Sequence, residues 1–237
     1  MIENLPIYIT LSFTLTTVAT WLLFIWAIKN SNSEFTRKKA IPISIFLIIW
    51  LAIQGTLTFK NIYAFDVNTF PPKILLFGLL PTMLIILFLF ITKNGKLFID
   101  SLPLKNLTYL NMIRIPVEVI LLWLFLNKAI PEIMTFEGRN FDIIAGITAP
   151  FVAYLGFSKK IISRKTILVW NIICLGLLIN IVVIALLSSE TPIQKFGFNQ
   201  PNIAIANFPF SWLATFIVPI VIFGHLVSIR QLLKNKS

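Results

Sequence analysis

The sequence predicts an all-α fold, an integral membrane bundle of seven transmembrane helices. Of its 237 residues, 57% are hydrophobic and only 12% are charged, and the mean hydropathy is +0.89. Soluble globular domains carry about twice that share of charged residues. The charged residues occur in short clusters separated by apolar runs, most of them about as long as a bilayer span requires. Basic clusters also alternate along the chain, as they do in multi-pass proteins.

Seven apolar runs are candidates for membrane helices, each of which needs about 20 residues. The first run is too long for the apolar region of a secretory signal, so we expect it to be retained as a membrane helix. Because the connections between the runs are short, residues 1–237 are predicted to form a single transmembrane domain. The expected spans cover residues 7–28, 41–59, 74–92, 107–127, 141–157, 166–187 and 213–229.

Basic residues predict the orientation of these spans. Every second connection is rich in Lys and Arg, and the connections between these hold most of the acidic residues, among them Asp66 and Glu190. Under the positive-inside rule, the N-terminus lies outside and the C-terminus lies in the cytoplasm. Frequent Ile, Lys and Asn suggest a bacterial source, so the expected location is the inner membrane. The basic connections and the tail carry Lys29, Arg37, Lys38, Lys39, Lys93, Lys96, Lys105, Lys159, Lys160, Arg164, Lys165, Arg230, Lys234 and Lys236.

A repeated proline spacing suggests a plan for the bundle. Phe70-Pro71 precedes Pro81, and Phe208-Pro209 precedes Pro219 at the same distance. The first and fifth runs are both followed by basic connections, as two parallel three-helix repeats joined by the fourth helix require. This 3+1+3 plan resembles that of SWEET-type transporters. Prolines are common in membrane helices, so a chance recurrence stays open as the alternative.

Polar side chains in the fourth run are expected at membrane depth. Asn111, Arg114 and Glu118 are spaced i, i+3 and i+7, so on a helix they share one face. Ionisable groups in hydrocarbon are costly and usually face the interior of a bundle, with a partner or a function. Depth along the expected spans adds three residues from other runs. The candidate ligand or transport path consists of Asn111, Arg114, Glu118, Tyr154, Asn171 and His225.

The arginine and the glutamate of this stripe also have a structural interpretation. Arg114 and Glu118 lie four residues apart, so they can form an ion pair that holds their helix against its neighbours. Pro116, between them, lacks a backbone N–H and frees a carbonyl near Met112 for a polar side chain or a ligand. The sequence does not decide between a structural pair and a site.

A second polar group precedes the fifth run, at the expected external mouth. Asp142 stands where an acidic N-cap or first-turn residue stabilises a helix. Gly138 permits a tight turn, and Glu137 can pair with Arg139. These residues predict either a capped, salt-bridged loop or an external gate that contacts a ligand.

The sequence lacks the residues and motifs that several classes of chemistry require. His225 is the single histidine, and no set of three metal ligands is evident, so no metal and no cofactor are predicted. No motif of a hydrolase, a metalloprotease or a nucleotide-binding protein is present. The single cysteine, Cys174, excludes an intramolecular disulfide. Since membrane orientation accounts for the net charge of +11, no nucleic-acid partner is expected.

Two resemblances follow from particular stretches. Residues 114–118, 136–142, 208–212 and 219–231 resemble a family of small bacterial membrane proteins without an assigned function. Pro116-Val-Glu118 is also similar to the Pro-x-Glu-Glu/Asp motif of the membrane-embedded lycopene cyclase domain, whose acids are thought to protonate an olefin. Here Val119 replaces the second acid, and residues 196–199 and 209–212, where that family has a second copy, contain neither acid. Only Glu118 carries over, as a general acid.

Three functions are compatible with these residues. The favoured hypothesis is binding or transport of a small molecule along the polar path around the fourth helix. The second is a non-catalytic membrane component or sensor that binds another membrane protein or a further copy of this chain. The third is an isoprenoid-modifying enzyme that uses Glu118; otherwise no catalytic residue is expected, and a non-enzymatic role is favoured. The lipid bilayer is the expected partner in every case.

Overall fold

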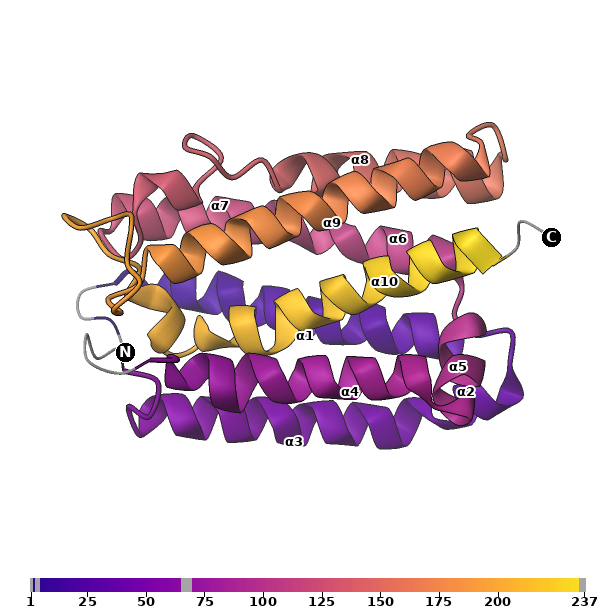
Figure 1. The fold of residues 1–237 in the computed structure, drawn as a ribbon, viewed down its shortest axis with the longest axis horizontal. Coiled ribbons are helices and arrows are strands. Elements are labelled where there is room, and N and C mark those ends of the chain that lie inside the picture. Colours follow the sequence, from indigo (N-terminus) through magenta and orange to yellow (C-terminus); the bar gives the residue numbers. More distant parts are fainter. Residues whose placement is uncertain (1, 3–4, 65–69, 235–237) are drawn as a thin grey trace.

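The structure, a computed structural model, describes residue 2, residues 5–64 and residues 70–234, and every regular element in these residues is a helix. The all-α prediction is therefore confirmed for this part of the chain. The long helices run roughly along one direction, while the short helices α2 (Glu34–Lys38) and α5 (Lys93–Asp100) lie together at one end (Figure 1). The predictions that involve Asp66 and Lys236 fall outside the described residues.

Within the described residues, five helices are long and apolar enough to cross a membrane. Each overlaps an expected span, and their length and composition indicate a multi-pass membrane protein. They are α1 (Ile7–Lys29), α3 (Ala40–Phe59), the continuous α6 (Leu104–Leu110), 3-10 turn η2 (Asn111–Ile113) and α7 (Arg114–Leu126), then α9 (Arg164–Leu187), and the π-helix η6 (Leu213–Ile217) with α10 (Val218–Lys234).

The other two expected spans are helical but broken or short. The third runs through the π-helix η1 (Leu75–Leu79) and α4 (Leu80–Ile91), and the chain then turns by 93° into α5. The fifth consists of α8 (Ile143–Ala153) and the π-helix η4 (Tyr154–Ser158), a shorter apolar helix. The number of seven spans, the orientation and the single-domain organisation stay predictions.

The end of the bundle that holds α2 and α5 is tied together by polar contacts. The Ser31 and Thr36 hydroxyls both hydrogen-bond the Ser101 side chain, at 3.0 and 2.7 Å. Asp100 of α5 forms ion pairs with Arg230 and Lys234, near the end of α10. The starts of α3, α6 and α9 and the ends of α1, α4 and α10 lie at this end, so the predicted cytoplasmic basic clusters gather there (Figure 1).

Short turns complete the opposite end. The 3-10 turns η3 (Glu132–Met134) and η5 (Ala204–Ala206) belong to the connections after α7 and α9. These connections pack against each other, because the Ile203 N–H donates to the Ala129 carbonyl and the Gln200 amide donates to the Ile130 carbonyl at 2.5 Å. The connection after α9 therefore covers the one that leads into α8.

Proline accounts for irregular turns in α4 and α10. Pro81 lies in the first turn of α4, directly after η1, and Pro219 lies in the first turn of α10, directly after η6. A proline ring displaces the carbonyl four residues earlier, which opens the helix to a wider turn. The repeated spacing thus recurs in the structure, and each copy begins at a cis Phe-Pro bond, before Pro71 and before Pro209. The 3+1+3 plan itself stays a prediction.

Helix α3 binds the carbonyls that these two prolines displace. The Gln54 amide donates to the Phe77 carbonyl at 3.2 Å, and the Trp50 indole N–H donates to the Thr215 carbonyl at 2.8 Å. Because Trp50 and Gln54 are four residues apart, one face of α3 serves both π-helices. A Cβ on Gly78 of η1 would overlap the Thr215 methyl carbon, so the two irregular turns also touch each other.

Candidate functional site

The polar stripe of the fourth span lies where its helix changes geometry. The chain leaves α6, makes the 3-10 turn η2 at Asn111, and begins α7 at Arg114. Pro116 therefore stands in the first turn of α7, where its missing N–H leaves no α-helical hydrogen bond unmade. Arg114 is 3% exposed and Glu118 is 1% exposed, so both lie in the interior of the bundle.

Arg114 connects α7 to three other helices. One terminal nitrogen donates to an Asp142 carboxylate oxygen at 2.6 Å, at the start of α8, and to the Cys174 carbonyl of α9 at 3.2 Å. The other terminal nitrogen lies 2.8 Å from His225 Nε2 on α10. A charge-assisted hydrogen bond of this kind is stronger than a neutral one, especially where water is excluded.

The contacts of His225 define its tautomer. A guanidinium only donates hydrogen bonds, so His225 Nε2 accepts from Arg114 and the ring proton is on Nδ1. That Nδ1–H donates to Asn171 Oδ1 at 2.9 Å, and the Asn171 amide donates in turn to the Ile167 carbonyl. The histidine is thus a neutral link between α9 and α10.

Glu118 has a different partner. The Asn140 amide nitrogen lies 2.7 Å from both carboxyl oxygens of Glu118, and it also donates to the Met134 carbonyl. Asn140 Oδ1 accepts from the Asp142 backbone N–H at 3.1 Å. The segment before α8 therefore folds back into the bundle and joins the Glu118 side of the stripe to the Arg114 side. We call the residues Arg114, Glu118, Asn140, Asp142, Asn171 and His225 the polar network.

A close helix contact brings Asp142 to Arg114. Gly146 lies one turn after Asp142 on the same face of α8, and a Cβ there would lie 2.9 Å from the Ile115 side chain and 3.0 Å from its backbone nitrogen. Only a residue without a side chain allows α8 to approach α7 this closely. Because residue 146 is glycine, α8 lies close enough to α7 for the short Asp142 side chain to reach the Arg114 guanidinium.

Four of the six predicted path residues meet in the polar network: Arg114, Glu118, Asn171 and His225. Asn111 is also buried, but its amide donates to carbonyls of its own helix, including that of Leu107 at 3.1 Å. Tyr154 is outside the network. Its side chain is 48% exposed, and its ring faces Lys159 at 5.8 Å.

The i, i+4 ion pair between Arg114 and Glu118, one of the two interpretations of the stripe, is wrong. Arg114 pairs with Asp142 from another helix, and Glu118 accepts from Asn140. The external mouth needs a correction too, because its three residues separate. Glu137 and Arg139 are exposed and no ion pair joins them in the described part of the chain, while Asp142 is 4% exposed and makes no side-chain cap. Arg114 attracts the carboxylate that a helix N-terminus would otherwise hold.

Two members of the site were not predicted as site residues. Asn140 stands between Arg139 and Asp142, but nothing in a single sequence shows that this connection folds back toward Glu118. Cys174 contributes its backbone carbonyl, which leaves no sequence signal at all. The Cys174 thiol is buried, as expected of a small interior residue.

Two buried polar atoms of the stripe lack a partner among the described residues. They are Arg114 Nε, a donor, and Asn111 Oδ1, an acceptor. Buried polar atoms of this kind are normally hydrogen-bonded, so a water molecule or a small ligand is needed to satisfy them. No group of three His, Cys, Asp or Glu side chains in the described residues is arranged to hold a metal ion.

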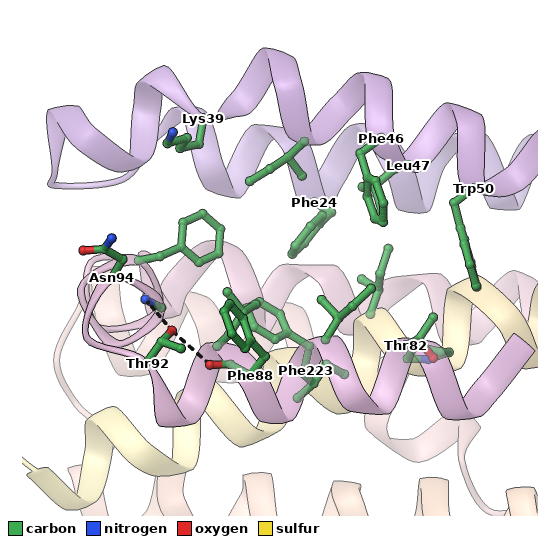
Figure 2. Close-up of a pocket in the computed structure, with 18 of the residues that line it drawn as sticks. Phe24, Lys39, Phe46, Leu47, Trp50, Thr82, Phe88, Thr92, Asn94 and Phe223 are labelled. Carbon is green, nitrogen blue, oxygen red and sulfur yellow. Dashed lines mark hydrogen bonds between the residues drawn. The ribbon is translucent and has the colours of Figure 1, made fainter.

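A separate apolar cleft of about 690 Å³ lies on the other side of α10. Side chains from α1, α3, α4 and α10 form its walls, among them Phe24, Phe46, Phe88 and Phe223 (Figure 2). Lys39, Thr92 and Asn94 lie at one end of the view and Trp50 at the other (Figure 2).

These features define a multi-pass helical membrane protein that buries four ionisable side chains, Arg114, Glu118, Asp142 and His225, inside the bundle. The chain belongs to a family: the model described as Domain of unknown function (DUF8737) matches residues 71–233, which include the whole polar network. The predicted membership of a family without an assigned function is thereby confirmed, and the bacterial source stays a prediction.

No curated protein and no solved structure matches the chain. The comparisons therefore lend no support to the resemblance to lycopene cyclases. The geometry does not favour it either, because Glu118 is almost fully buried and Asn140 occupies both of its carboxyl oxygens.

Proposed function

We propose that this protein binds or transports a small polar molecule, with its site beside Arg114 in the polar network. The observation that carries the proposal is that two buried atoms on neighbouring positions of the stripe, Arg114 Nε and Asn111 Oδ1, have no hydrogen-bond partner among the described residues. Ionisable residues at membrane depth mark sites or pathways by default, because burying them without a function is costly.

The two atoms limit the chemistry of the ligand. Arg114 Nε offers a hydrogen bond and Asn111 Oδ1 accepts one, so the ligand carries a group that both accepts and donates. The residues are three apart, so they are neighbours on one helix face, with Cβ atoms roughly 5–6 Å apart. A hydroxyl or an amide of a small uncharged solute meets both requirements. A carboxylate does not, since it has no hydrogen to donate to Asn111.

Access to this site requires the bundle to open. Asn140 bridges Glu118 and Asp142 on the side of the α8 connection, which is in turn covered by the connection after α9. In the proposal, these contacts form the gate on the predicted outer side, and release of the Glu118–Asn140 hydrogen bonds admits the solute. The external-gate interpretation thus moves from Glu137 and Arg139 to Asn140.

The test uses purified protein in liposomes and three uncharged probes, glycerol, urea and acetamide. After a hyperosmotic step with each probe, light scattering follows the re-swelling of the vesicles. We expect faster re-swelling than in empty liposomes with at least one probe, and loss of that increase in Asn111→Leu. Tyr154→Phe, which changes a polar side chain outside the network, is the matched control and retains the flux.

Glu118→Gln separates a site from a structural contact. If the Glu118–Asn140 hydrogen bonds form the gate, the weaker acceptor opens it more readily, so the flux rises in this variant while the unfolding temperature stays close to that of the parent protein. If all three probes enter at the rate of empty vesicles, or if Asn111→Leu and Tyr154→Phe behave alike, the proposal is wrong.

A non-catalytic membrane partner or sensor is the second candidate. It is favoured by the closure of most of the network, in which Asp142, Asn140, Asn171 and His225 satisfy one another as a packed core does. In that case the network variants lose stability without any change in permeability, and mild extraction recovers the chain with a second membrane protein or a further copy of itself.

A further inference from the structure

The apolar cleft has the shape of a site for a hydrocarbon chain. Its volume of about 690 Å³ lies within the range of small-molecule sites, roughly 300–1,000 Å³. Along α3 it extends from Lys39 to Trp50, a separation of eleven residues, or about 16 Å of helix. Its walls are aliphatic and aromatic for most of that length, so a polar solute gains nothing there.

Positive charge is confined to one end of the cleft. Lys39, at the start of α3, and Lys93, the first residue of α5, both line this end, and both are exposed. None of the described lining residues is acidic, and no ion pair in the described chain includes either lysine. The opposite end, at Trp50 and Thr82, carries no charge.

The start of α5 adds further donors at the same place. Thr92 caps this helix by accepting from the Gly95 N–H, and Asn94 presents its side chain beside it (Figure 2). A helix N-terminus carries partial positive charge, which reinforces the two lysines. An anion bound here meets two ammonium groups, an amide and a helix terminus, with an apolar cleft directly below.

We propose that the cleft binds an anionic phospholipid, with an acyl chain between α3, α4 and α10 and the phosphate at Lys39 and Lys93. The predicted orientation places this end at the cytoplasmic surface, where membranes carry anionic lipid. The inference is independent of the polar network, which lies on another face of α10.

The experiment is a native mass-spectrometry titration of delipidated protein with phosphatidylglycerol and, in parallel, with phosphatidylcholine of the same chain length. The parent protein prefers phosphatidylglycerol. The double variant Lys39→Ala/Lys93→Ala binds it roughly 25-fold more weakly, since each lysine near a membrane surface contributes about a factor of five.

The matched control is Lys38→Ala/Lys96→Ala. It removes the same charge from neighbouring positions that do not line the cleft, and it retains the parent affinity. Leu47→Trp fills the cleft and weakens binding while both lysines remain. Circular dichroism confirms that each variant keeps its helices.

Three results would overturn the proposal. One is equal binding of the two phospholipids. Another is equal loss of affinity in the two double-lysine variants, which would mean that net charge alone attracts the lipid. The third is displacement of phosphatidylglycerol by millimolar glycerol 3-phosphate, which would mean that the site binds the phosphate and that the acyl chain of the lipid has no role.

Discussion

The polar network and the apolar cleft share α10 as a common wall. They differ in whether the groups that line them find partners within the chain. His225 enters the network, and Phe223, two residues earlier and therefore on another face, lines the cleft. The network satisfies nearly all of its polar atoms with partners from four helices. The cleft is an apolar volume of about 690 Å³ with two lysines at one end. The contrast shows that polar side chains in a membrane must find partners within the chain, while apolar surface can be covered by lipid.

Removing the guanidinium breaks the network most severely. Arg114→Leu leaves the Asp142 carboxylate buried without its cation, and we expect a loss of about 3–5 kcal/mol in the free energy of unfolding. Thermal unfolding in detergent micelles measures the loss. Phosphatidylglycerol binding to the protein that remains folded should be unchanged, because the cleft lies apart from the network.

A second substitution checks the cause of that loss. Arg114→Leu/Asp142→Asn removes the orphaned charge, so it should be more stable than Arg114→Leu alone. If the double variant is no better, the cost arises from the packing of the long side chain and not from the buried ion pair.

Two glycines test the approach of α8 to α7. Gly146→Ala places a Cβ against Ile115, and overpacking of this kind costs about 1–3 kcal/mol. Gly176→Ala on α9 is the control, because a Cβ there meets nothing within 4 Å and alanine favours the helix. Thermal unfolding should fall in the first variant and hold or rise in the second. Equal shifts would contradict a specific close contact.

Sequence patterns predict the helices of this protein better than they predict its contacts. Apolar run length places the long helices because the bilayer sets that length. Periodicity also places Asn111, Arg114 and Glu118 on one helix face, and all three side chains are buried. The partner of Arg114 depends on tertiary structure. The i, i+4 rule selects Glu118, whereas the observed partner, Asp142, lies at the start of α8, which packs closely on α7 because residue 146 is glycine. Asn140 is missed for a similar reason, since its role depends on the path of a connection.

The hydrogen bond from Trp50 to the carbonyl that Pro219 displaces can be tested at one end of the cleft. Trp50→Phe leaves the Thr215 carbonyl without its donor, and a buried carbonyl without a partner costs about 1–3 kcal/mol. Trp26→Phe, at a partly exposed position on α1, is the matched control and should have little effect. Thermal unfolding compares the two. If both variants unfold at the same temperature, Trp50 stabilises only by its bulk at the end of the cleft.

The smallest effect is expected at the ion pairs that hold α5, the helix that brings Lys93 to the cleft. Burial alone would raise the pKa of Asp100, but hydrogen bonds and charges from Arg230 and Lys234 outweigh it, so the pKa lies below the ordinary value of 3.8. A carboxyl with a lowered pKa in the folded state stabilises the fold above the unfolded value, and this contribution is lost as the pH falls through the folded pKa. Because the site is partly open to solvent, the contribution is under about 1 kcal/mol. Asp100→Asn should therefore unfold at a slightly lower temperature than the parent at pH 7, and the difference should shrink once the pH falls below 3.8. A difference that persists unchanged at low pH would assign the effect to the hydrogen bonds of α5 and not to its charge.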